Sequence, residues 1–272
     1  HSTAGTTAVG DAVGVAASDL TRHAADVVLE TEDLRAILAA IGEGRIVQDN
    51  LKRAIEYLIT QNLAECALVL APAALGMTPP LSSLQLLWIN LLTDTVPALA
   101  LALEPGRPDI LARGPSAPDA PLLSPDAGRR IVRDGLALAG LGLGALALGG
   151  PAAAFATLTS AELGYAFLCR ATDAPPSPRF RQLMGVGGGP PLATLVVPPL
   201  RTVLGMPGQP SLFEAAGFVG GFVVPWLLAP EDGVIVRRGT CAAGLVAAAV
   251  PAGAAGRGMQ SLAARPRQRR KA

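Results

Sequence analysis

Long runs of apolar residues constrain the fold of this chain more than any other feature. Six such runs are separated by turn or loop segments, at about residues 57–75, 81–103, 131–149, 152–169, 183–200 and 212–228. The fifth is the weakest, and its "GGGPP" segment is predicted to interrupt it. A helix needs about 20 mostly apolar residues to cross the hydrocarbon core of a bilayer. Because 50% of the residues are hydrophobic and only 16% are charged, we predict an all-α polytopic membrane protein with about six transmembrane helices in the lipid bilayer.

Residues 1–44 have a different character and resemble the end of a soluble α/β domain. The segment "VVLE", residues 27–30, is typical of a short buried strand, and Leu34, Ile37 and Ile41 recur at helical spacing after it. A helix starting near Leu34 can continue without a break from Arg45 as a polar stalk that becomes a membrane span after Tyr57. Since the chain starts at His1 without a signal-peptide pattern, we expect it to be a piece of a longer protein or the product of a badly bounded open reading frame.

The distribution of basic residues predicts which side of the membrane the loops occupy. The stalk and three loops carry most of them, among these Arg107, Arg113, Arg129, Arg130, Arg133, Arg170, Arg179, Arg181, Arg237 and Arg238, whereas the opposite loops carry only Arg201. Cytoplasmic loops are enriched in Lys and Arg, so the C-terminus is predicted to be cytoplasmic. The basic tail, residues 231–272, suits anionic lipid better than nucleic acid. Residues 240–256 are apolar but broken by Pro251, and we favour a loose tail over a seventh span.

Polar side chains inside the first two spans are the candidates for function. Asn62 and Glu65 are three residues apart in the first span, and Asn90, Thr93 and Asp94 share one face of the second. A charged residue at the centre of a membrane helix costs about 2.5–3.5 kcal/mol, so it needs a partner or an ion. Two helices joined by the short turn at residues 76–80 are antiparallel neighbours, and their polar faces can therefore converge.

The donor atoms of this set are all oxygens, which favours a hard cation. Pro97 cannot donate to the carbonyl of Thr93, so that carbonyl is predicted to be a further ligand beside Asp94. His and Cys are absent from the set, which argues against a soft transition metal. The alternative is hydrogen bonding between helices, which is the favoured interpretation for Asn62 or Thr93 taken alone. Glu162 in the fourth span is a third acidic candidate, although its depth is open.

The segment "YLITQNLAECALVLAPAALGMTPPLSSLQLLWINLLTDTVPALALALEP" resembles the fifth and sixth membrane helices of P-type cation-transporting ATPases, closest to the calcium-pump-like branch. Residues upstream resemble the end of that family's phosphorylation domain and its stalk, and residues downstream resemble its helices seven to ten. The resemblance covers about residues 10–238. It implies that Asn62, Glu65, Asn90, Thr93, Asp94 and Glu162 are the ligands of a transported divalent cation, calcium first, with manganese or magnesium as alternatives.

The chain also departs from the family's pattern. The phosphorylated DKTGT motif, the TGE motif, the nucleotide-binding domain and the fourth helix do not occur in it, and Thr95 stands where calcium pumps usually have glycine. We therefore expect no catalytic residue in this chain. ATP and magnesium chemistry is expected to come from missing sequence, either the N-terminal part of the pump or a split partner chain. A bacterial plasma membrane is the expected location.

The predicted organisation has five parts. These are a remnant of the phosphorylation domain at 1–44, the stalk and first hairpin with the cation site at 45–104, a cytoplasmic loop at 105–130, four further membrane helices at 131–230 and the basic tail at 231–272. The function predicted is the ion-translocating part of an ATP-driven pump. The alternatives are a truncated or split-gene subunit without transport activity and a secondary cation transporter, for which inverted repeats are not evident.

Overall fold

The computed structural model describes residues 11–13, 27–29, 35–107, 109–112, 121–170, 175–206 and 208–228. Its elements in chain order are β1 (Asp11–Val13), β2 (Val27–Leu29), α2 (Arg35–Ala74), α3 (Ser83–Trp88), the π-helical turn η1 (Ile89–Asp94), α4 (Thr95–Ala102), α5 (Pro125–Leu168), α6 (Pro178–Val196), α7 (Pro198–Val203) and α8 (Leu212–Leu228). The basic tail at residues 231–272, with its apolar stretch at 240–256, lies outside the described residues.

Among the described residues, three helical segments are long and apolar enough to cross a membrane: α2, the continuous run Ser83–Ala102 formed by α3, η1 and α4, and α5. The all-α membrane class is therefore confirmed. Helix α5 consists of two arms, because Gly150 has φ 78° and ψ −170° directly before Pro151. These arms correspond to the predicted third and fourth spans. Helices α6 and α8 are shorter, with 19 and 17 residues.

The N-terminal strands form a small parallel pair, in which Asp11 lies opposite Val27 and Val13 opposite Leu29. The strand predicted at residues 27–30 is thus present at Val27–Leu29. That residues 1–44 are the remnant of a phosphorylation domain stays a prediction.

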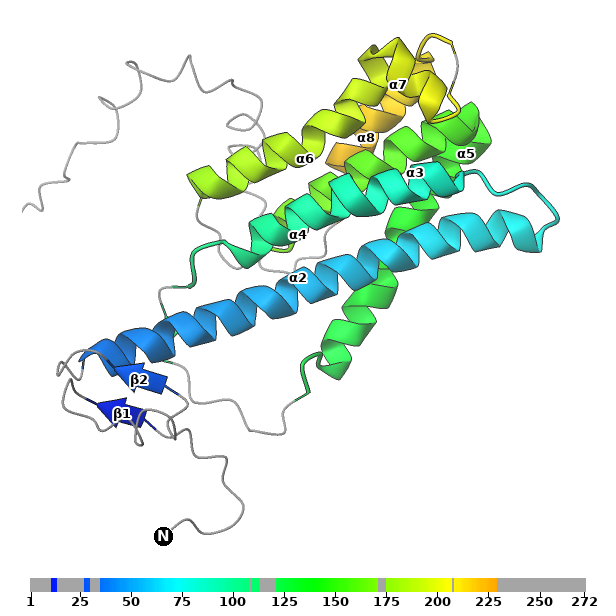
Figure 1. Ribbon diagram of the computed structural model, residues 1–272. Helices are drawn as coiled ribbons and strands as arrows, with labels where there is room; N and C mark the ends of the chain where they lie inside the picture. The colour runs from blue at the N-terminus through cyan, green and yellow to red at the C-terminus, as the bar shows by residue number, and fades with distance from the viewer. Residues whose placement is uncertain are drawn as a thin grey trace, which may run out of the picture.

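Local sequence signals set where the helices begin and end. Gly76 adopts φ 74° after α2, a conformation that glycine tolerates best. Ser82 accepts a hydrogen bond from the backbone of Gln85, whose side chain accepts one from the Ser82 backbone. Ser124 and Ser177 cap α5 and α6 by accepting from the backbone amides of Ala127 and Phe180, and each is followed by proline in the first helical turn. The turn between α2 and α3 reverses the direction of the chain, and α4, at the end of the following span, packs against α2 (Figure 1).

The fifth apolar run differs from its prediction. We expected the sequence "GGGPP", residues 187–191, to interrupt it, yet α6 continues through Pro190 and Pro191. Gly189 has no Cβ to collide with the ring of Pro190, so the usual restriction on the residue before proline is relaxed. The break falls instead at Val197, which has φ −105° and ψ 101° before Pro198.

Helix α5 is the centre of the bundle and packs against both α2 and α8 (Figure 1). Its second arm is buried at every position from Ala153 to Leu168. Helix α4 packs against α2 and α6. Large side chains such as Tyr57, Phe155 and Leu101 fill the space between these helices and are no more than 1% exposed. Three elements that are distant in the sequence, α2, η1–α4 and α5, are thereby brought together at one depth.

Two buried ion pairs fix the ends of the bundle. Arg170, after α5, lies 2.8 Å from Glu104, after α4, and the side chains are 8% and 2% exposed. Arg201 in α7 lies 2.7 Å from Glu214 in α8, and these side chains are 3% and 7% exposed. The only arginine predicted on the opposite side of the membrane, Arg201, is therefore a structural residue that joins α7 to α8.

Candidate cation site

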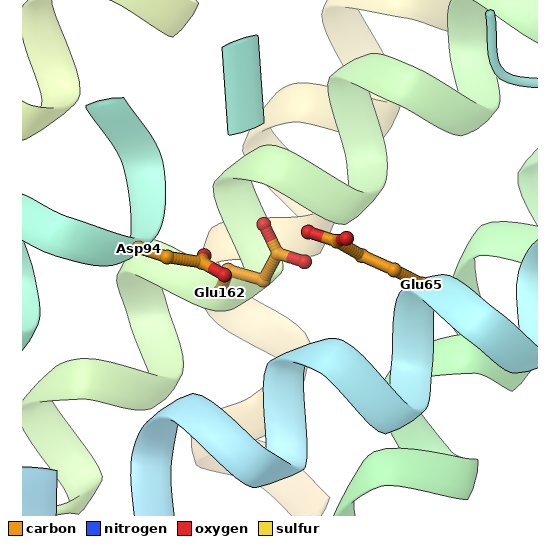
Figure 2. Close-up of side chains that lie close together, drawn as sticks. All are labelled: Glu65, Asp94 and Glu162. Atoms are coloured by element: carbon orange, nitrogen blue, oxygen red, sulfur yellow. The ribbon is translucent and has the colours of Figure 1, made fainter. Parts of the chain in front are cut away.

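Three carboxylates from three elements meet in the interior of the bundle (Figure 2). Glu65 comes from α2, Asp94 from the end of η1 and Glu162 from the second arm of α5. One oxygen of each lies within 4.8 Å of the others, and the residues are only 5%, 1% and 0% exposed. Glu65 and Asp94 are 29 positions apart in the sequence, and Asp94 and Glu162 are 68 positions apart. We call these three residues the acidic cluster.

The acidic cluster has no balancing positive charge among the described residues. Every ion pair found there joins other residues. Two like charges 4.8 Å apart repel by about 3 kcal/mol at an effective dielectric constant of about 20. Desolvation adds a further penalty for each buried charge. An arrangement this costly indicates that a bound cation or protons compensate it.

Missing hydrogen bonds point to the same cluster. Seven of the ten buried side-chain polar atoms without a hydrogen-bond partner in the described structure are oxygens in or beside it. They are Glu65 Oε1, both carboxylate oxygens of Asp94 and of Glu162, Thr93 Oγ1 and Gln61 Oε1. Buried polar groups in proteins are nearly always hydrogen-bonded. A concentration of unsatisfied acceptors is what an oxygen-coordinated cation requires of its ligands.

Asn90 and Thr93 lie beside the acidic cluster, as their predicted helical face requires. The Asn90 amide donates to Glu65 Oε2 at 2.8 Å and to the Leu86 carbonyl at 3.0 Å. It therefore orients the one Glu65 oxygen that is hydrogen-bonded. Thr93 is fully buried, and its hydroxyl oxygen is without a partner.

The carbonyl of Thr93 is not left open, contrary to the prediction drawn from Pro97. The hydroxyl of Tyr57 in α2 donates to this carbonyl at 3.2 Å. The ring of Tyr57 also stacks on that of Tyr165, with centroids 6.3 Å apart. Sequence reasoning considered only the helix containing the proline, whereas the neighbouring helix supplies the replacement donor. Tyr57 thus anchors α2 to the turn that carries Asp94.

Asn62 does not reach the acidic cluster. Its side chain is exposed and donates to the Leu58 carbonyl one turn earlier. The buried face of α2 runs through Tyr57, Gln61, Glu65 and Leu68, and Asn62 lies about 100° around the helix from Gln61. The assumption that a spacing of three places Asn62 and Glu65 on one buried face was wrong, because Glu65 lies at the edge of that face.

Gln61 is the neighbour that sequence reasoning missed. It is fully buried, and its amide donates to the Glu162 carbonyl at 3.2 Å. The spacing of four between Tyr57, Gln61 and Glu65 is the signal that could have identified it. The described set is therefore three carboxylates with Asn90, Thr93 and Gln61 beside them.

Sequence comparison identifies the protein family in which the acidic cluster occurs. Residues 78–229, more than half of the 272, match the family described as "Cation transporting ATPase, C-terminus". The chain is similar to calcium-transporting ATPase 4, endoplasmic reticulum-type, of Arabidopsis thaliana, with 38% identity over 116 residues, which are 43% of this chain and 11% of that protein.

Two further relatives are similar over nearly the same length. Calcium-transporting ATPase 1 of Bacillus cereus is 38% identical over 107 residues, 39% of this chain and 12% of the relative. Potassium-transporting ATPase alpha chain 2 of Oryctolagus cuniculus is 39% identical over 107 residues, 39% of this chain and 10% of the relative. The aligned part of the chain thus spans about a tenth of the length of these curated relatives.

Proposed function

Because this chain belongs to the cation-transporting P-type ATPases, of which it carries the C-terminal membrane part, we propose that its acidic cluster holds the cation that the pump transports. The observation that carries the proposal is the set of five unpartnered carboxylate oxygens on Glu65, Asp94 and Glu162. Neutral oxygens of Thr93 and Gln61 complete the ligand set, and Asn90 orients Glu65. Asn62 is left out, since its side chain faces away.

A divalent cation suits this cluster better than a monovalent one. Three carboxylates carry up to three negative charges, so a doubly charged ion compensates more of the repulsion. Calcium takes six to eight oxygen ligands in flexible geometry, whereas magnesium demands a near-ideal octahedron and keeps several waters. Relatives named for calcium transport include plant and bacterial proteins, although a potassium-transporting relative is equally similar. We therefore propose calcium first, then manganese or magnesium.

We propose that ATP chemistry, including the phosphorylated aspartate and its magnesium, belongs to sequence outside this chain. Helix α2 is suited to transmit movement from such a part to the acidic cluster. Its 40 residues extend over about 60 Å as one helix. Asn50 of α2 donates to the Glu104 carbonyl at 2.6 Å, and Tyr57 holds the Thr93 carbonyl. A displacement of α2 therefore acts directly on α4 and on Asp94.

Two finer features are proposed together with this role. The first part of α2, the loop at residues 105–130 and the basic loop at residues 170–181 are proposed to lie in the cytoplasm with the C-terminus, because most of the basic residues fall on them. The membrane is proposed to be a bacterial plasma membrane. The partner is proposed to be the remainder of the pump, whether in the same polypeptide or in a separate chain.

The test is direct binding of calcium and manganese to the 272-residue chain in lipid nanodiscs, measured by equilibrium binding of radioactive calcium and by electron paramagnetic resonance of manganese. Saturable binding is expected, and Asp94→Asn should weaken it at least a hundredfold, because it removes a buried charged ligand. Asp126→Asn is the matched control, since Asp126 is exposed and forms a surface ion pair with Arg129. Absence of saturable binding in the unmodified chain, or equal affinity in Asp94→Asn, would disprove the proposal.

A further inference from the structure

One threonine hydroxyl in the bundle bonds to a carbonyl at an unusual distance along the chain. Helical Thr60, Thr159 and Thr202 each donate to the carbonyl four residues earlier, at 2.7, 2.9 and 3.1 Å. This is the usual back-bond of threonine in an α-helix. Thr95 instead donates to the carbonyl of Asn90, five residues earlier, at 2.8 Å. The hydrogen bond of the Thr95 hydroxyl thus spans five residues, which is the spacing of backbone hydrogen bonds in a π-helix. Thr95 is the residue directly after η1.

The π-helical turn decides which residues of this span face the bundle. Gln85, Ile89, Thr93, Pro97 and Leu101 are all buried and recur every four residues. In an α-helix, four residues turn about 40° more than one full turn. Five positions spaced by four would therefore spread over about 160° around the helix axis. A π-helical turn takes up one extra residue and returns the later positions to the same face. Without it, Thr93 and Asp94 could not share a face with both Gln85 and Leu101.

The π-helical turn has to compete with an ordinary α-helix over the same residues. In an α-helix the Asn90 carbonyl would accept from the Asp94 amide, whereas in the π-helical turn it accepts from the Thr95 amide. The Thr95 hydroxyl adds a second donor to this carbonyl in the observed arrangement. Pro97 weakens the α-helical alternative, because it has no amide for the Thr93 carbonyl.

We propose that Thr95 is a positioning residue, whose hydroxyl holds η1 in its π-helical form and thereby places Thr93 and Asp94 at the acidic cluster. This inference rests on the proposed cation site. Thr95 itself is exposed on the outer side of the span, so it does not touch the ion. Its contribution is to select the arrangement of the helix that presents the ligands.

The test is calcium and manganese affinity of Thr95→Val in the full 272-residue chain in nanodiscs. Loss of one hydrogen bond that favours the binding arrangement should weaken binding roughly three- to tenfold. Thr95→Ser, which keeps the hydroxyl, should restore affinity to within about twofold of the unmodified chain. Thr202→Val is the control, because Thr202 is equally exposed and loses an ordinary back-bond. All three variants should remain folded without cation, as judged by a cooperative thermal unfolding transition.

The outcomes separate the two proposals. If the unmodified chain binds neither ion, the cation site itself fails. If it binds and Thr95→Val binds equally well, or if Thr95→Ser is as weak as Thr95→Val, only the role of Thr95 is overturned. Thr95→Ala removes the same hydroxyl with a smaller side chain. Unfolding of both Thr95→Val and Thr95→Ala would also overturn the inference, because a residue that only positions ligands leaves the fold intact.

Discussion

The bundle contains two kinds of buried carboxylate, and they differ in what surrounds them. Glu104 and Glu214 each lie against a buried arginine and also accept a backbone amide, from Ser177 and Ser211 respectively. Glu65, Asp94 and Glu162 are buried to a similar degree, yet five of their six oxygens have no partner. The contrast shows that the buried carboxylates that join helices, Glu104 and Glu214, have an arginine and a backbone amide as partners. The acidic cluster is the exception.

The arginines of the first kind are themselves well satisfied. Arg201 also donates to the carbonyls of Thr194 and Gly208, and Arg170 lies over the ring of Phe180 at 5.3 Å from its centroid. Such geometry is what allows a buried ion pair to recover its desolvation cost. Because the bundle supplies these partners at both ends, their absence around the acidic cluster is a local property of the site.

The largest expected effect comes from breaking a satisfied pair. Arg201→Met should lower the free energy of unfolding by about 3–5 kcal/mol, because Glu214 is left as an uncompensated buried charge. Unfolding in mixed micelles, followed by circular dichroism, measures the change. The double variant Arg201→Met with Glu214→Gln should recover part of the loss. A loss below about 1 kcal/mol in the single variant would mean that the two kinds of carboxylate do not differ in this way.

Neutralising one acid of the acidic cluster should raise the free energy of unfolding, whereas Arg201→Met lowers it. Without cation, Glu162→Gln is expected to raise the free energy of unfolding by about 1–3 kcal/mol, because it removes a buried charge that repels two others. The same unfolding measurement, with a chelator present, tests the sign. In millimolar calcium the gain should shrink or reverse, since the unmodified chain then gains binding energy. Destabilisation by Glu162→Gln in chelator would indicate that the cluster is structural.

Sequence reasoning predicted most of the fold because its signals are local. Apolar runs, the turn at Gly76 and the Gly150–Pro151 break each act within a few residues, and the structure has helices and interruptions at these places. The exception was the "GGGPP" segment, where the glycines relax the constraint that prolines impose.

The candidate site was only partly predictable, because it depends on contacts between helices. Two of the three residues on the predicted face of the second span lie near Glu65, since Asn90 donates to its carboxylate and an Asp94 oxygen lies within 4.8 Å of a Glu65 oxygen. Glu162 could not be assigned a depth from the sequence, since only packing of α5 against α2 brings it to the others. The π-helical turn and the Tyr57 bond to the Thr93 carbonyl were missed for the same reason. Each of them is a response of one helix to its neighbour.

The smallest expected effect concerns two adjacent amides, Gln61 and Asn62. Gln61 is buried with an unpartnered oxygen, whereas Asn62 is exposed and bonded to its own helix. In the 272-residue chain, Gln61→Leu should weaken calcium binding about three- to tenfold through loss of a neutral ligand, as judged by equilibrium binding in nanodiscs. Asn62→Leu is the matched control and should change the affinity less than about twofold.

This pair of variants tests the rotation of α2 as well as the ligand set. Resemblance to the family assigns the ligand role to Asn62, and the structure favours Gln61 because it lies on the buried face with Tyr57 and Leu68. The two residues differ by about 100° around the helix axis. A larger loss in Asn62→Leu than in Gln61→Leu would therefore mean that α2 presents a different face when it binds the ion. Equal affinities in both variants would restrict the ligands of α2 to Glu65, and the unpartnered oxygen of Gln61 would then need another explanation.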